Sequence, residues 1–193
     1  MGKGRLEAFS DGVIAIIITI MVLELKVPHG NSLNELLPIV PALLGYILSF
    51  IYIGIYWNNH HHMLHLCHKV TGRILWANLH LLFWLSLIPF ATGWLGESHF
   101  APRPAALYGL VLFMAAIAYS LLQMQIIRSQ GEGSVLKQAV GSDWKGKLSI
   151  VIYFLAIALT LWAAELSLAL YILVALMWLV PDRRIERTIH ENS

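Results

Sequence analysis

Apolar residues fill long stretches of this chain, and short polar segments separate them. A helix that crosses a bilayer core of about 30 Å needs roughly 20 apolar residues. We predict six transmembrane helices, over residues 8–25, 37–58, 74–95, 104–127, 147–164 and 167–181. The pattern therefore indicates an all-α integral membrane protein, with residues 1–193 forming one six-helix unit.

Two features of this pattern need interpretation. The last apolar block, residues 147–181, is too long for one span and short for two, and Glu165 near its middle divides it. Pro38, Pro41 and Pro89 lie inside or at the ends of predicted spans. Neighbouring helices can satisfy the carbonyls that a proline frees, so these prolines are compatible with transmembrane helices.

Composition supports a lipid environment. Hydrophobic residues make up 58% of the chain and charged residues 12%, whereas a soluble domain is typically about 25% charged. The net charge of +2 is too small to indicate a nucleic-acid partner. The single cysteine, Cys67, excludes an internal disulfide bond.

The basic residues indicate the orientation. Six spans place Lys26 and Arg103 on one side of the membrane. The other side holds Lys3, Arg5, Lys69, Arg73, Arg128, Lys137, Lys145, Lys147, Arg183, Arg184 and Arg187. Lysine and arginine concentrate in cytoplasmic loops, so we expect both termini in the cytoplasm and the protein in the cell membrane.

The first predicted span carries the most information. Asp11 lies within it, and an ionisable residue inside a membrane is costly unless it is paired or hydrated. The alternative is an interfacial acid that the dipole of the helix N-terminus favours. Ile16, Thr19, Ile20 and Leu23 share one face at spacings of three and four residues. In a helix that is apolar all round, such a face by itself more often packs than lines a pore.

Several short strings in the first three spans occur together in one known family. They are Arg5-x-x-x-Phe9-Ser10-Asp11-Gly12, Thr19, Leu23-Glu24-Leu25-Lys26-Val27-Pro28, Trp57-Asn58-Asn59-His60-His61, Trp76-Ala77-Asn78 and Leu87-Ile88-Pro89-Phe90. In this order and spacing they resemble the transmembrane protein 175 family, the endosomal and lysosomal potassium channels and their prokaryotic relatives. A single six-helix unit resembles the prokaryotic members, which assemble as homotetramers.

The resemblance implies a potassium-conducting cation channel, weakly selective over sodium, whose pore is lined by the first helix of each copy. Ile16, Ile20 and Leu23 would form a hydrophobic constriction, with Thr19 adding a hydroxyl layer. A narrow apolar neck can gate by dewetting. The chain has no Thr-Val-Gly-Tyr-Gly string, so no re-entrant filter loop is expected. Thr19 and Ile20 are about 100° apart on a helix, and the sequence leaves open which faces the axis.

The resemblance also gives the polar groups of the first helix partners on the second and third spans. The expected network comprises Arg5, Phe9, Ser10, Asp11, Asn59, His60, Trp76 and Asn78. Histidine, asparagine and indole N–H groups offer the donors that a buried carboxylate needs. This network would support the pore helix and would not be the ion path itself.

A dense run of histidines follows the second span: His60, His61, His62, His65 and His68. A hydrated cytoplasmic extension of the helix is the favoured interpretation. Metal binding and pH sensing are the alternatives. The run lacks the glutamate of a His-Glu-x-x-His zinc helix, so we predict no metal site.

Three functional hypotheses follow. The first is the channel, with potassium as permeant ion, copies of the chain and the bilayer as partners, and no cofactor. The second is a proton or small-ion transporter that uses Asp11 and the histidine cluster as a relay, although inverted repeats are absent. The third is a membrane metalloenzyme, which is disfavoured because no nucleophile or acid–base constellation is present.

Overall fold

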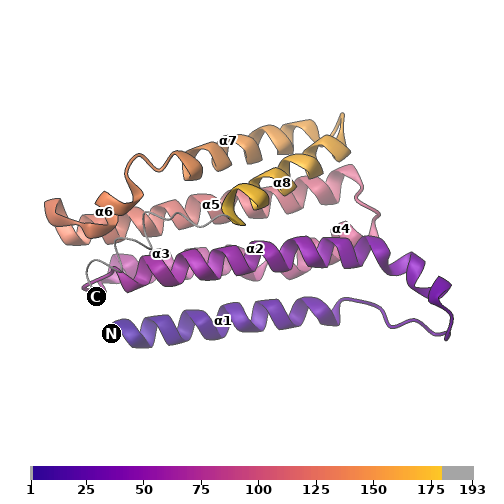
Figure 1. The fold of residues 1–193 in the computed structure, drawn as a ribbon, viewed down its shortest axis with the longest axis horizontal. Helices are drawn as coiled ribbons and strands as arrows, with labels where there is room; N and C mark the ends of the chain where they lie inside the picture. The colour runs from indigo at the N-terminus through magenta and orange to yellow at the C-terminus, as the bar shows by residue number, and fades with distance from the viewer. Residues whose placement is uncertain (1, 180–193) are drawn as a thin grey trace.

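The computed structural model describes residues 2–179, and these form helices joined by short connections (Figure 1). In chain order the elements are α1 (Lys3–Leu23), η1 (Leu33–Ile39), α2 (Val40–His65), α3 (Gly72–Ser86), α4 (Ile88–Glu97), α5 (Pro102–Gln130), η2 (Gly131–Gly133), α6 (Val135–Val140), α7 (Trp144–Leu159) and α8 (Ala164–Leu179). The fold of the described residues is all-α, as predicted.

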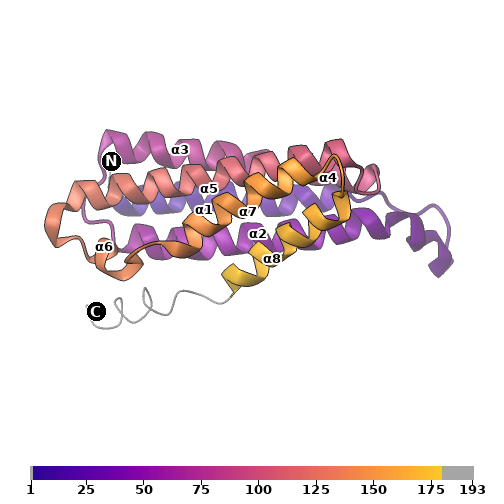
Figure 2. The same cartoon turned by 90° about the horizontal axis from the view of Figure 1, so that it is seen from above.

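The long helices run side by side along one axis, and their order across the bundle determines what α1 contacts. Helix α1 lies at one edge and packs against α2, α3 and α4, while α7 and α8 form an antiparallel hairpin at the opposite edge (Figures 1 and 2). Helix α5 lies between these edges and contacts α3, α4 and α7. Within residues 2–179, one side of α1 therefore has no packing partner.

The helix boundaries differ from the predicted spans where prolines and polar ends decide them. Helix α1 begins at Lys3, and α2 continues to His65. The third predicted span is interrupted at Leu87, which separates α3 from α4. Pro89 explains this break, because it lacks an N–H and its ring clashes with the preceding turn.

Among the described residues, four helical segments are long and apolar enough to cross a membrane: Lys3–Leu23, Leu33–His65, Gly72–Glu97 and Pro102–Gln130. Helices α7 and α8 have 16 residues each, or about 24 Å. They are joined by a turn at residues 160–163, so Glu165 lies in the first turn of α8. Residues 180 and 181 of the last predicted span, and Arg183, Arg184 and Arg187, lie outside the described residues.

Hydroxyl groups inside the bundle are hydrogen-bonded, as they must be where water is scarce. Tyr52 donates to the carbonyl of Tyr171, whose own hydroxyl donates to the carbonyl of Ala105 at 3.1 Å. Ser49 Oγ lies 3.0 Å from the hydroxyl of Tyr108. These hydrogen bonds connect α2, α5 and α8, and we refer to these three helices as the scaffold.

Candidate functional site

Helix α1 has two distinct faces. Leu6, Ser10, Ile14, Ile17 and Met21 are buried against the rest of the bundle. They recur at spacings of three and four residues, which is the repeat of one helical face. The orientation of α1 about its own axis is therefore fixed by packing.

The opposite face of α1 is exposed and almost entirely apolar. Ile16 is 58% exposed, Ile20 42% and Leu23 79%, and Thr19 is exposed beside them. The Thr19 hydroxyl is within hydrogen-bond distance of its own helix, 3.1 Å from the carbonyl of Ala15 and 3.0 Å from that of Ile16. The hydroxyl hydrogen is thus bonded within α1, and on the exposed side the Thr19 oxygen presents a lone pair.

A groove runs along α1 where it meets α4, and its far end is acidic. Ile16, Ile20 and Glu24 line it from α1 and its C-terminus, and Glu97 lines it from α4. Lys26 Nζ lies 2.8 Å from Glu97 Oε1, and hydrogen bonding with this carboxylate raises the pKa of Lys26. Both side chains are largely exposed, so the pair adds little stability. It does link the C-terminal end of α1 to α4.

A directional chain of hydrogen bonds joins three helices near the other end of α1. Ser10 Oγ donates to the carbonyl of Leu6 at 2.9 Å. Ser10 must then accept from Asn78 Nδ2, which lies 2.9 Å away. Asn78 Oδ1 therefore faces His60 Nε2 at 2.7 Å. Because an amide oxygen only accepts, His60 Nε2 carries a hydrogen. Ser10, His60 and Asn78 are all buried.

Asp11 bonds a residue that was not among the expected members of the network. The indole Nε1 of Trp57 donates to Asp11 Oδ1 at 3.1 Å, whereas Trp76 is 76% exposed and donates to no group of the described residues. Arg5 and Phe9 are exposed on the outer side of α1. Within residues 2–179, Arg5 forms no ion pair.

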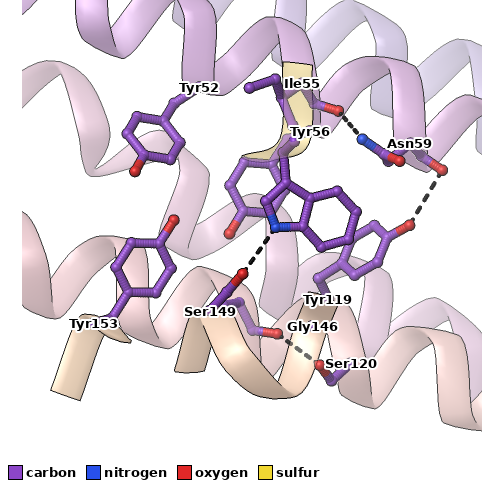
Figure 3. A pocket seen from close by; sticks show the side chains of 11 residues that line it. Tyr52, Ile55, Tyr56, Asn59, Tyr119, Ser120, Gly146, Ser149 and Tyr153 are labelled. Carbon is purple, nitrogen blue, oxygen red and sulfur yellow. Dashed lines mark hydrogen bonds between the residues drawn. The ribbon is translucent and has the colours of Figure 1, made fainter. Parts of the chain in front are cut away.

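Asn59 also lies apart from this chain of hydrogen bonds. Its Nδ2 donates to the carbonyl of Ile55 in its own helix at 2.8 Å, and its backbone carbonyl accepts from Tyr119 at 3.3 Å (Figure 3). It lines a small cavity between α2, α5, α7 and α8, which four tyrosines also line (Figure 3). The Asn59 side chain therefore lies outside the chain of hydrogen bonds formed by Ser10, Asn78 and His60, whereas Trp57, which the expected network did not include, bonds Asp11. The sequence signal for Trp57 was its i,i+3 spacing from His60, which puts both residues on one face of α2.

The histidine run does not gather into one site. His61 stacks on Trp57 with ring centroids 6.4 Å apart, and the ring centroid of His65 lies 6.4 Å from that of His61. His60 faces α3 through Asn78. Among residues 2–179, no three His, Cys, Asp or Glu side chains are placed to hold a metal ion.

Comparison with known proteins identifies the class of protein to which this fold belongs. Residues 5–89 match the family described as "Endosomal/lysosomal potassium channel TMEM175". The crystal structure of a lysosomal potassium-selective channel TMEM175 homolog from Chamaesiphon minutus has a similar fold. Its TM-score is 0.80 at 29% sequence identity, over 93% of this chain and 97% of that one. The fold and the family define a membrane ion channel and not an enzyme.

A bacterial and an animal relative show how the length of this chain compares with that of other family members. A potassium channel from Chryseobacterium sp. strain P1-3 is 60% identical over 192 residues, which span both chains completely. The human endosomal/lysosomal proton channel TMEM175 is 28% identical over 88% of this chain but only 36% of its own length. The chain belongs to the TMEM175 family, and its length is that of the bacterial relative.

Proposed function

We propose that four copies of this chain form a potassium-conducting channel whose pore is lined by α1. The observation that carries the proposal is the exposed apolar face of α1. In a bilayer, a face with Ile16, Ile20 and Leu23 exposed and the opposite face buried contacts either lipid or another copy of the chain. The channel class of the family favours another copy, because a pore lined by one helix needs that helix from several subunits. The bacterial relatives named as potassium channels support potassium as the permeant ion. Weak selectivity over sodium is part of the proposal.

On this proposal Ile16, Ile20 and Leu23 form successive hydrophobic rings around the pore axis. They span seven residues of helix, or about 10 Å of the pore. Such a neck excludes water unless it widens, so it acts as the gate. Thr19 lies between the rings, and its outward lone pair is suited to a partly dehydrated cation because its hydrogen is bonded within α1.

We further propose that residues 1–193 form one domain with six spans and both termini in the cytoplasm of the cell. Helices α7 and α8 would then supply the last two spans, each somewhat shorter than an average bilayer core. Shorter spans are accommodated by local thinning of the bilayer. The excess of lysine and arginine at one end of the bundle supports this orientation.

The test is potassium flux into liposomes that contain the purified protein. We expect Ile16→Asn to raise flux over wild type, because an amide ring hydrates the neck. A fall of about 1.4 kcal/mol in the barrier corresponds to about a tenfold higher rate. Flux is measured with a potassium-sensitive dye at matched protein content.

Leu173→Asn is the matched control, since it puts the same amide at an exposed apolar position of α8, 51% exposed in the described chain. Its flux should equal that of wild type. Equal flux in the Ile16 variant and wild type, or an increase in both variants, would reject α1 as the pore helix.

Proton conduction is a second candidate, favoured by the name of the human relative as a proton channel. A pH indicator inside the same liposomes tests it, with potassium equal on both sides. A relay from Asp11 to the histidines has weaker support, because the side-chain partner of Asp11 is the indole of Trp57, which does not exchange protons at neutral pH.

A further inference from the structure

A second groove, which no residue of α1 lines, lies between the start of α3 and the end of α5. The two helices run antiparallel, so the first turn of α3 and the last turn of α5 meet at one end of the bundle (Figure 2). Arg73 and Trp76 line the groove from α3, and Gln125, Arg128 and Ser129 line it from α5. Nothing in the ion pathway proposed above uses this groove.

The groove carries two arginines, and the described part of the chain supplies no opposite charge to it. Among residues 2–179, no aspartate or glutamate lines it. Within residues 2–179, neither Arg73 nor Arg128 forms an ion pair with a carboxylate. The N-terminus of α3, a helix of 15 residues, adds the positive end of its dipole at Gly72. Two guanidinium groups and a helix N-terminus at one groove are the features that bind phosphate.

The position of the groove along the helices corresponds to the headgroup layer. The segment Gly72–Glu97 has 26 residues and α5 has 29, which is about 39–44 Å of helix. A hydrocarbon core is about 30 Å thick, so the ends of both segments reach the polar layer. Trp76 lies one turn inward from Arg73 and is largely exposed, as tryptophans at the membrane interface commonly are.

An exposed apolar strip continues from the groove toward the middle of the bundle. Phe83 is exposed on α3, on the same side as Trp76, and Leu121 is exposed on α5 and lines the groove. A free phosphate ion would use only the charged end. An acyl chain attached to the phosphate would also cover the strip, so the site fits a lipid better than an inorganic anion.

We propose that this groove binds the phosphate of an anionic phospholipid, held by Arg73 and Arg128, with an acyl chain along Trp76, Phe83 and Leu121. Guanidinium groups form paired hydrogen bonds with phosphate oxygens, and Gln125 and Ser129 supply further polar contacts. The lipid would fill the groove between α3 and α5 and so join the α1-bearing half of the bundle to the scaffold.

The test is native mass spectrometry of the purified protein in detergent, titrated with phosphatidylglycerol. We expect wild type to retain bound lipid and the double variant Arg73→Gln, Arg128→Gln to bind at least about tenfold more weakly. The variant Arg73→Lys, Arg128→Lys should keep part of the binding, since it retains charge but not the paired hydrogen bonds. Size-exclusion profiles check that each variant is folded.

The matched control is Arg103→Gln with Lys137→Gln, which removes two exposed cations elsewhere in the chain. It should bind phosphatidylglycerol as wild type does. Equal loss in both double variants would overturn the proposal, as would equal binding of phosphatidylcholine. Displacement of the lipid by millimolar inorganic phosphate would also overturn it, because the site would then be one for free anions. Potassium flux enters none of these readouts, so failure here leaves the channel proposal standing.

Discussion

Replacing Gly109 with alanine is expected to lower the stability of the protein by roughly 3 kcal/mol, the range seen when a packed core is overfilled. A Cβ at this position of α5 would lie 1.9 Å from the hydroxyl oxygen of Tyr171 and 2.9 Å from Cγ1 of Ile157. Tyr171 is fully buried and its hydroxyl is bonded to the carbonyl of Ala105, so the ring cannot move aside. Thermal unfolding of the purified protein in detergent measures the loss.

Gly54→Ala provides the control for this prediction. Gly54 also lies within a long helix, but a Cβ there would meet nothing within 4 Å. Its replacement should change stability by no more than about 1 kcal/mol, the intrinsic difference between glycine and alanine in a helix. Tyr171→Phe combined with Gly109→Ala should recover part of the loss, since it removes the nearest atom. No recovery would mean that the close approach of α5 and α8 is not the cause.

Replacing Asn78 with leucine is expected to lower the free energy of unfolding by about 2 kcal/mol and to weaken the packing of α1 against the bundle. Asn78 is fully buried, and it is the only side chain in the described residues that bonds both Ser10 and His60. Leucine has a similar volume but no polar group, so His60 would lose the acceptor for its buried Nε2–H. Thermal unfolding and the oligomer peak in size-exclusion chromatography report the effect.

Asn59→Leu is the matched control, because Asn59 is also buried but its side chain bonds only its own helix. The cost there should be clearly smaller. A double-mutant cycle with His60→Leu should give a coupling energy of about 1 kcal/mol between His60 and Asn78. If Asn59→Leu and Asn78→Leu are equally costly, the three-helix chain of hydrogen bonds does not anchor α1.

The helices of this protein were largely predictable from hydropathy. The split of the last apolar block near Glu165 agrees with the α7–α8 turn, because a carboxylate cannot be left inside an apolar span. The break between α3 and α4 was not predicted as an interruption, although Pro89 was in view. Hydropathy averages over a whole span and does not register a local loss of hydrogen bonds.

The side-chain contacts of the polar network were harder to predict than the helices, and helix geometry explains why Trp76 and Asn59 lie outside it. Trp76 and Asn78 are two residues apart and so lie on nearly opposite sides of α3. Only Asn78 faces α1. Asn59 and His60 are adjacent and about 100° apart, which sends one toward the scaffold and the other toward α3. A motif read as a string cannot assign faces, whereas a helical projection would have favoured Trp57 over Trp76.

The sequence by itself determined that the chain is an all-α membrane protein, where most helices lie, and to which family it belongs. These properties depend on local hydrophobicity and on short motifs, both written along the chain. Only the tertiary structure decided which face of α1 stays open, which residue holds Asp11, and that two distant arginines share one groove. Those features depend on how each helix is rotated against its neighbours, and packing across the whole bundle sets that rotation.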